Sequence, residues 1–275
     1  MTDQQPETTG WNTQRSQVWV ELQPMLDRLF SPFERILVDA VEAQGARAVL
    51  DIGCGAGATT LAIAQQFGGE VDCTGLDISQ DLVDAASRRA EGMGNVRFLC
   101  ADAQRHAFAP EQFDAIVSRF GVMFFDDPVA AFANLRAAAR PGAALTCIAW
   151  RSASDNPFMT VQRRAIAQVL GPQGDPAPDA PGQFAFADDG RVRGILADAG
   201  WSDIDIRPIN VLCTLSADDL PVYARRMGGM DAIAADLDEA QWGRLEAALD
   251  RGFAGFVVDG VARFEAACWV VQAKR

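Results

Sequence analysis

Apolar residues recur along this chain with two different spacings, and the change from one to the other predicts the order of its elements. Between residues 11 and 44 they recur every three or four positions, which predicts helix with interruptions at Pro24 and Pro32. From residue 46 onward, short apolar runs alternate with helical stretches, which is typical of a parallel sheet covered by helices. The expected strands of this core are 48–52, 71–76, 96–100, 113–117 and 144–150.

After residue 150 the alternation becomes irregular, and long loops separate the elements. The expected elements are, in order, a helix over 157–169, a loop rich in Pro and Gly over 171–182, a helix over 188–200, a strand over 204–209, helices within 216–251 and a strand over 263–272. Five parallel strands are thus followed by a late pair of strands, and the last strand is expected to be antiparallel. The pattern predicts an α/β domain.

The first expected strand ends in an acid and leads directly into alternating glycines. From Val49 onward the sequence reads VLDIGCGAGATT. Glycine lacks a Cβ and adopts positive φ readily, so a ligand can approach the backbone closely where the next helix begins. The stretch from Gly53 to Ala58 also matches the GxGxxA pattern of dinucleotide-binding proteins. Asp51 argues against a pyrophosphate at this turn, because like charges repel, and it favours a cationic ligand.

This stretch resembles the first motif of the class I S-adenosylmethionine-dependent methyltransferases, whose cofactor carries an ammonium and a sulfonium but no phosphate. The resemblance is strong over residues 46–150 and weak over the late strands. Trp11-Asn12 and 118–125 resemble the ubiquinone and menaquinone biosynthesis C-methyltransferases in particular. It implies a Rossmann-like, seven-stranded, mostly parallel sheet with helices on both faces and a helical cap. It also implies S-adenosyl-L-methionine as cofactor, with Asp51 near its methionine portion. The glycines expected to form the floor of the site are Gly53, Gly55 and Gly57.

Acids also follow the second and third expected strands. Asp77 ends the second strand, where a carboxylate can accept hydrogen bonds from both hydroxyls of a ribose. Dehydrogenases share this feature, so Asp77 supports adenosine binding without choosing the chemistry, and Ser79 fits the role of helix cap better than Asp77 does. The resemblance implies that Asp102 contacts the adenine amino group. Backbone groups next to these acids, at Ile78 and Ala103, are implied contacts as well.

The loop after the fourth strand faces the same crevice, because ligands bind outside the carboxyl ends of the strands in open α/β sheets. The resemblance implies that backbone groups of Ser118 and Phe120 hold the amino group of the cofactor. Arg119 is a candidate for binding the cofactor carboxylate or an anionic substrate, and a structural pair with Asp126 or Asp127 is the alternative. The candidate substrate-binding residues are Arg119, Met123, Trp150 and Tyr223.

An N-terminal helix covers the cofactor in the methyltransferases that the chain resembles. Trp11, Arg15 and Trp19 repeat every four residues and would share one helix face. Trp11 and Arg15 are therefore candidates for cofactor contact, and simple packing of the tryptophans onto the domain is the alternative.

No residue stands out as a general base. His106 is the only histidine, but the resemblance places it beside the adenine, far from the methyl group. Tyr223 and Asp155 are the other candidates, and the sequence does not choose among the three. Methyl transfer from an activated cofactor depends mainly on proximity and orientation, so a base is not required for every acceptor.

Charge and composition exclude several classes of protein. The chain has 275 residues, a net charge of −13 and no cluster of basic residues, so nucleic acid is not expected as a partner. The six cysteines have no CxxC spacing, which favours reduced buried thiols over a metal site. The polar N-terminus and the absence of an apolar run of about 20 residues predict a cytoplasmic protein without a membrane span. Abundant alanine and arginine, with Lys274 the single lysine, suggest a GC-rich bacterial genome.

The segments outside the core are expected to form a cap that determines substrate specificity. The expected organisation is an N-terminal cap segment (1–45), the cofactor-binding core (46–150), a cap insertion (151–187), a core helix and strand (188–210), a second cap insertion (211–258) and the last core strand (259–275). The Met, Phe and Trp content of the cap is typical of an apolar acceptor site, and also of an ordinary hydrophobic core.

The favoured hypothesis is a methyltransferase of class EC 2.1.1 that methylates an oxygen, nitrogen or carbon atom of a small molecule. The alternatives are an NAD-dependent oxidoreductase and a non-methylating protein that binds S-adenosylmethionine. The sequence leaves the acceptor undetermined, and it leaves open whether the protein forms a homodimer.

Overall fold

The computed structural model describes residues 14–275 apart from 173, 175–179, 228–229, 231–232 and 234–236. The strands are β1 (Ala48–Ile52), β2 (Asp72–Asp77), β3 (Val96–Cys100), β4 (Phe113–Arg119), β5 (Ala139–Trp150), β6 (Ser202–Ser216), β7 (Val257–Val258) and β8 (Val261–Lys274). The α-helices are α1 (Gln14–Glu21), α2 (Gln23–Gln44), α3 (Ala58–Phe67), α4 (Gln80–Arg89), α5 (Pro128–Ala138), α6 (Val161–Leu170), α7 (Asp189–Asp198), α8 (Leu220–Met227) and α10 (Glu239–Ala254). Three short 3-10 helices are η1 (Gly68–Glu70), η2 (Val122–Phe124) and η3 (Pro157–Thr160).

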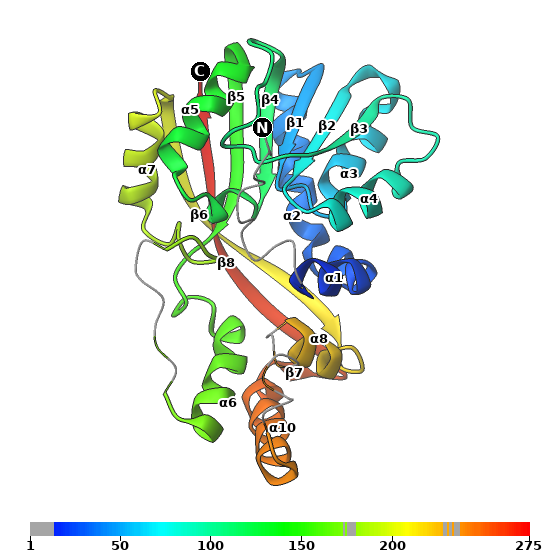
Figure 1. The fold of residues 1–275 in the computed structure, drawn as a ribbon, viewed down its shortest axis with the longest axis vertical. Helices are drawn as coiled ribbons and strands as arrows, with labels where there is room; N and C mark the ends of the chain where they lie inside the picture. The colour runs from blue at the N-terminus through cyan, green and yellow to red at the C-terminus, as the bar shows by residue number, and fades with distance from the viewer. Residues whose placement is uncertain (1–13, 173, 175–179, 228–229, 231–232, 234–236) are drawn as a thin grey trace, which may run out of the picture.

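The long strands form one sheet in the order β3-β2-β1-β4-β5-β8-β6 (Figure 1). β1 to β5 pair in parallel, whereas β8 runs antiparallel to β5 and β6. The chain changes direction across the sheet between β1 and β4, which creates a crevice at the carboxyl ends of these strands. The predicted Rossmann-like sheet is confirmed. The sequence did not predict β7, which pairs with the start of β8.

The long helix α2 contradicts one expectation. Pro24 lies in the first turn of α2, where a missing N–H has no helical partner to lose, and the chain does break just before it. Pro32, however, lies inside the helix, which continues through it to Gln44. The neighbouring side chains Leu29 and Phe33 are fully buried against the core. This packing outweighs the cost of an interior proline, about 3 kcal/mol, so the predicted interruption at Pro32 was wrong.

Two further expectations differ from the structure. Arg140-Pro141-Gly142 was expected to lie before the fifth strand, but β5 begins at Ala139 and includes it. Ser79 does occupy the N-cap position of α4, yet its side chain makes no cap hydrogen bond. The Oδ1 atom of Asp77 instead accepts a hydrogen bond from the Ser79 N–H at 2.9 Å. Ser79 is therefore the N-cap residue of α4, as expected, but its side chain does not cap the helix.

β6 and β8 are much longer than expected and carry the sheet into the cap. Both extend beyond the other strands, and α6, α8 and α10 lie around their far ends (Figure 1). The boundary expected at residue 210 falls inside β6, whose pairing with β8 is continuous from Asp205 to Ser216. The second part of the cap is therefore built on the same two strands as the core.

Asn156 fixes β8 where the core meets the cap. Its side chain is fully buried, donates to the carbonyl of Ala267 at 2.9 Å and accepts from the N–H of Ala267 at 2.9 Å. A buried backbone group that loses its partner costs about 1–3 kcal/mol. The side chain of Asn156 therefore replaces a missing strand partner at this position.

We expect Asn156→Ala to lower the free energy of unfolding by about 2 kcal/mol, because the N–H of Ala267 loses its partner. Asn210→Ala is the matched control, since Asn210 pairs with the same residue of β8 but is exposed, and its side chain bonds to the side chains of Glu265 and Arg151 at the surface. Its effect should stay within about 0.5 kcal/mol. Urea unfolding of both variants measures the difference, and equal midpoints would contradict this role of Asn156.

Candidate active site

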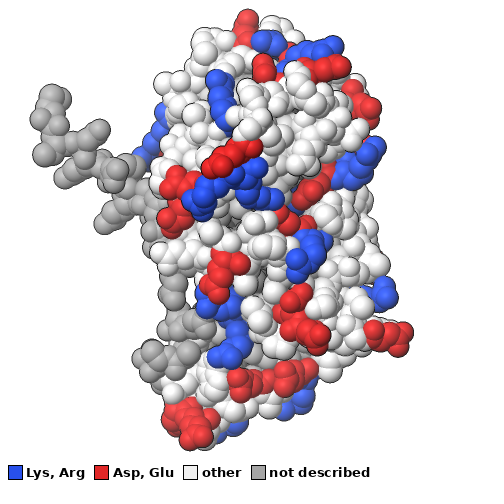
Figure 2. Space-filling view, turned by 90° about the vertical axis from the view of Figure 1, so that its right-hand side faces the viewer, with Lys and Arg blue, Asp and Glu red and all other residues white. Residues whose placement is uncertain are grey.

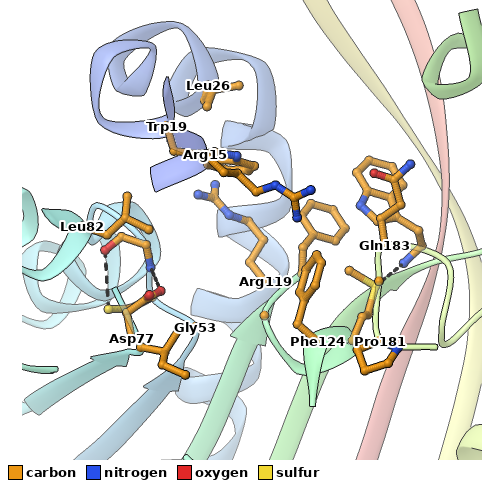
Figure 3. A pocket seen from close by; sticks show the side chains of 18 of the residues that line it. Arg15, Trp19, Leu26, Gly53, Asp77, Leu82, Arg119, Phe124, Pro181 and Gln183 are labelled. Atoms are coloured by element: carbon orange, nitrogen blue, oxygen red, sulfur yellow. Dashed lines mark hydrogen bonds between the residues drawn. The ribbon is translucent and has the colours of Figure 1, made fainter. Parts of the chain in front are cut away.

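A cavity of about 1150 Å³ lies at the carboxyl ends of β1, β2 and β4. Its floor is the glycine loop between β1 and α3, and α1 and the start of α2 lie over it (Figure 3). The other side is closed by residues of η3, α6 and α8 and by the loop 180–185. A site for one drug-sized ligand has roughly 300–1,000 Å³, so this cavity is large enough for two ligands.

The three glycines of the loop have positive φ but different surroundings. A Cβ on Gly53 (φ +63°) would lie 2.6 Å from the Cα of Gly121. A Cβ on Gly55 (φ +56°) would meet nothing within 4 Å, and Gly55 lines the cavity. Gly57 (φ +86°) packs against Phe98 and does not line the cavity. Packing thus requires a glycine at position 53, and Gly55 leaves open space in which a ligand can lie. Gly57 is the N-cap residue of α3.

Asp51 lies at the end of β1, 1% exposed, and lines the cavity. Burial raises its pKa to about 7, although the hydrogen bond from Thr60 and the charge of Arg119 act in the opposite direction. The Thr60 hydroxyl donates to the Asp51 carboxylate at 2.6 Å. A carboxyl with a raised pKa gains from a cationic neighbour, because the cation favours its ionised form.

Asp77, at the end of β2, ties two backbone segments together. Its two carboxylate oxygens accept hydrogen bonds from the N–H groups of Gly55 at 2.8 Å and of Ser79 at 2.9 Å. Burial raises its pKa, whereas these backbone hydrogen bonds lower it. Both Asp77 and Ile78 line the cavity, as Figure 3 shows for Asp77.

Asp102 and Ala103, which follow β3, also line the cavity. Asp102 is half-buried, accepts a hydrogen bond from the N–H of Gln104 at 2.9 Å and forms an ion pair with Arg105 at 3.6 Å. The structure therefore brings Asp51, Asp77 and Asp102 to one edge of the sheet, around one cavity.

The loop after β4 combines a buried hydroxyl with a strained aromatic residue. Ser118 does not line the cavity, because it is buried and its hydroxyl donates to the carbonyl of Ile52 at 2.7 Å. Phe120 does line it, has φ +63° and stacks on Trp150 with ring centroids 4.3 Å apart and planes 6° apart. Positive φ is rare for a bulky residue and marks functional sites more often than other positions. Phe30 packs edge-on against both rings.

Arg119 pairs with neither of the expected acids. Its guanidinium donates to Glu34 of α2 at 3.0 Å and to the carbonyl of Phe30 at 3.3 Å. The alternative of a pair with Asp126 or Asp127 is therefore wrong. No local pattern points to Glu34, which lies 85 residues away in the sequence. Burial raises the pKa of Glu34, and Arg119 partly offsets this.

Arg15 and Trp19 of α1 line the cavity together, as expected for residues on one helix face. Figure 3 shows Arg15 and Arg119 extending into the same space from opposite walls. Trp11 lies outside the described residues. Among the other substrate candidates, Met123, Trp150 and Tyr223 all line the cavity.

The three base candidates lie in different surroundings. His106 does not line the cavity and packs edge-on against Phe108, with ring centroids 4.6 Å apart. Asp155 is also outside it, where it accepts from Ser152 at 2.8 Å and pairs with Arg151 at 3.2 Å. Tyr223 lines the cavity, but burial raises the pKa of its hydroxyl well above the usual value, so this group holds its proton at neutral pH.

Several residues of the cavity wall were not singled out from the sequence. Those from the cap and the neighbouring loop are Met159, Thr160, Gln162, Arg163, Ile166, Gln183, Phe184, Arg226 and Met227. Gln162 is buried on α6, whose other buried positions are apolar. A buried polar side chain needs a hydrogen-bond partner, so Gln162 is the residue that could have indicated a polar site. Arg89 of α4 was not expected either. It does not line the cavity, but it bonds to the carbonyl of Ala56 in the glycine loop and to Asp27 of α2.

The chain is similar to known methyltransferases in sequence and in structure. Residues 49–142 match the family model of a methyltransferase domain. A demethylmenaquinone methyltransferase from Renibacterium salmoninarum is 27% identical over 65% of this chain and 76% of that protein. The aklanonic acid methyltransferase DauC from a Streptomyces species is 31% identical over 46% and 60%. The solved structure of the YcgJ protein from Bacillus subtilis superposes with a TM-score of 0.58 at 19% identity and covers 88% of this chain and 97% of that one.

The sheet order, the acids at the strand ends and these comparisons support a class I S-adenosylmethionine-dependent methyltransferase. The printed names of two of these relatives, a demethylmenaquinone methyltransferase and an aklanonic acid methyltransferase, are those of small-molecule methyltransferases. No helix among the described residues has the length and apolar character needed to cross a membrane.

Proposed function

We propose that this protein transfers the methyl group of S-adenosylmethionine to an apolar small molecule bound between the sheet and the cap. One observation carries the proposal. A single cavity joins the three carboxylates at the ends of β1, β2 and β3 to an aromatic wall formed by Phe120 and Trp150. The carboxylates suit a cationic nucleoside cofactor, and the rings suit an apolar acceptor beside it.

The residues present fit this cofactor. Gly55 leaves open space above the loop, where a side chain would stand in the ligand's place. In the proposed arrangement Asp51 faces the charged methionine portion, Asp77 the ribose hydroxyls and Asp102 the adenine amino group. Arg15 and Trp19 would cover the cofactor from α1, because both line the same cavity. Ile78, Ala103 and Phe120 would add backbone contacts.

The bound cofactor supplies an already activated methyl group, so the protein's task is to orient the acceptor and exclude water. Phe120 and Trp150 form one rigid face of the acceptor site, held edge-on by Phe30. Tyr223 stays protonated and can donate a hydrogen bond to the acceptor. Methyl transfer from an activated cofactor does not require a base for every acceptor, and the proposed mechanism assigns none to the protein.

Transfer of an isotope-labelled methyl group tests the proposal. The protein would be incubated with methyl-labelled S-adenosylmethionine and a panel of aromatic carboxylates, phenols, enols and amines, and products would be identified by mass. We expect a labelled product from a flat aromatic acceptor, and less of it when Trp150→Ala removes the stacked ring. Cofactor binding without any labelled product would favour the non-methylating alternative.

The affinity for S-adenosylmethionine should depend on pH through Asp51. A cation beside Asp51 stabilises the carboxylate, and below pH 7 part of the free protein has this group protonated. Binding must then release a proton, so the affinity rises with pH up to about 7 and levels off above it. We expect an increase of about tenfold between pH 6 and pH 8 in the wild type, and a nearly flat profile for Asp51→Asn. Calorimetry in two buffers of different ionisation enthalpy measures the proton release.

The redox alternative has less support. A pyrophosphate would have to lie beside Asp51, whose charge opposes it. The relatives found carry names of methyltransferases that act on demethylmenaquinone and aklanonic acid. The assignment to class EC 2.1.1, a cytoplasmic bacterial origin, the absence of nucleic acid partners and a homodimer remain predictions.

A further inference from the structure

The charges that line the cavity are unevenly distributed. The acids Asp51, Asp77 and Asp102 stand at the ends of β1, β2 and β3. The cap side differs. The described residues that line the cavity from η3, α6, α8 and the loop 180–185 include Arg163 and Arg226 but neither Asp nor Glu.

This distribution is unexpected in so acidic a protein. The net charge is −13, and acids outnumber Lys and Arg by 37 to 24. The part of the wall formed by these cap elements therefore carries arginines and no acid among its described residues, although Asp27 and Asp126 also line the cavity elsewhere. Arginine is also the side chain best suited to bind carboxylates, because its planar guanidinium offers five N–H donors.

The two arginines come from different helices of the cap. Arg163 lies in the first turn of α6 and is exposed. Arg226, in the last turn of α8, is about one-third exposed and forms an ion pair with Glu21 of α1. The residue after Arg163 and the residue before Arg226 are also arginines, yet neither of these lines the cavity.

Besides the polar residues Thr160, Gln162, Gln183 and Tyr223, the acceptor side has a large apolar part. The wall residues between the sheet and the cap include Phe30, Trp150, Met159, Ile166 and Met227. A ligand that fills this space needs a flat apolar body, and its polar end would face the arginines.

We propose that the acceptor is an anionic apolar molecule, an aromatic carboxylate in the simplest case, and that Arg163 and Arg226 select it through its negative charge. This inference rests on the proposed function, because it assigns the substrate class of the same cavity.

A matched pair of probes tests the inference by binding alone. Anthraquinone-2-carboxylate and its carboxamide have nearly the same shape and differ in charge. Each would be titrated into the protein saturated with S-adenosylhomocysteine, with tryptophan fluorescence as the readout. We expect the carboxylate to bind at least about tenfold more tightly at low salt, and the preference to shrink at high salt because the charges are partly exposed.

The neighbouring arginines provide the controls. Arg163→Gln and Arg226→Gln should each remove most of the preference for the carboxylate. Arg164→Gln and Arg225→Gln should keep it, since neither of these arginines lines the cavity. Glu21→Gln removes the ion pair but leaves Arg226, and should keep or increase the preference. Melting temperatures and the affinity for S-adenosylhomocysteine show whether each variant is folded.

The outcomes separate this inference from the proposed function. Equal affinity for the two probes, no binding of the carboxylate, or the same loss in the Arg164 and Arg225 variants would overturn the selection of an anion. Absence of S-adenosylhomocysteine binding by the wild type would instead contradict the proposed function itself.

Discussion

Asp77→Ala is expected to weaken the binding of S-adenosylhomocysteine by at least about 100-fold while the protein stays folded. The substitution removes the carboxylate proposed to hold the ribose and releases the N–H groups of Gly55 and Ser79, which it orients. The fold should survive, because burial raises the pKa of Asp77, which shows that its charge is itself costly to bury. Calorimetric titration of both proteins gives the ratio of dissociation constants.

Asp84→Ala is the matched control for this experiment. Asp84 lies on the next helix, α4, where it accepts a hydrogen bond from Gln80 at the surface. Its removal should leave the affinity unchanged within about twofold. An Asp77 variant that is folded and binds with the wild-type affinity would exclude Asp77 from the ribose site.

Gly53→Ala should be the most disruptive substitution in the glycine loop, with a loss of about 3 kcal/mol in the free energy of unfolding. Two effects add. The positive φ of 63° costs an alanine about 1–2 kcal/mol, and a Cβ would lie 2.6 Å from the Cα of Gly121, a backbone atom that cannot rotate away. Denaturant unfolding measures the loss.

Gly55→Ala separates these two effects. Gly55 has a similar φ of 56°, but its Cβ would meet nothing within 4 Å. We therefore expect a loss of only about 1 kcal/mol in stability, together with weaker cofactor binding because the methyl group occupies the cradle. Equal destabilisation by the two substitutions would show that the contact between Gly53 and Gly121 does not limit the packing of the loop.

The core could be predicted from the sequence because its signals are local. Apolar runs, the glycines after Asp51 and the acids after two further strands are all visible in short stretches of sequence. The rule that ligands bind at the carboxyl ends of parallel strands then places Asp51, Asp77 and Asp102 together. The structure does bring these three side chains to one cavity.

The remaining features depend on contacts between distant segments. The ion pair between Arg119 and Glu34 joins β4 to α2, and no local pattern indicates it. Pro32 continues a helix because residues beside it are buried against other elements. β6 and β8 are long because they pair with each other over most of their lengths. The alternation of apolar and polar residues within either strand does not reveal this pairing.

The cap illustrates the same limit. Figure 2 shows acidic and basic side chains interspersed on one face of the molecule, as the composition suggests. From sequence alone, the arginines of the cap cannot be told from ordinary solvated charges. Only the fold distinguishes Arg163 and Arg226, which line the cavity, from their neighbours Arg164 and Arg225, which do not.

The central claim is that the carboxyl ends of β1 to β3 bind S-adenosylmethionine, and parallel calorimetric titrations with S-adenosylmethionine, S-adenosylhomocysteine and NADH test it most directly. The account predicts saturable binding of the first two at one site per chain, and none of NADH. If NADH binds and neither adenosyl compound does, the role given to Asp51 is contradicted and the oxidoreductase alternative is favoured.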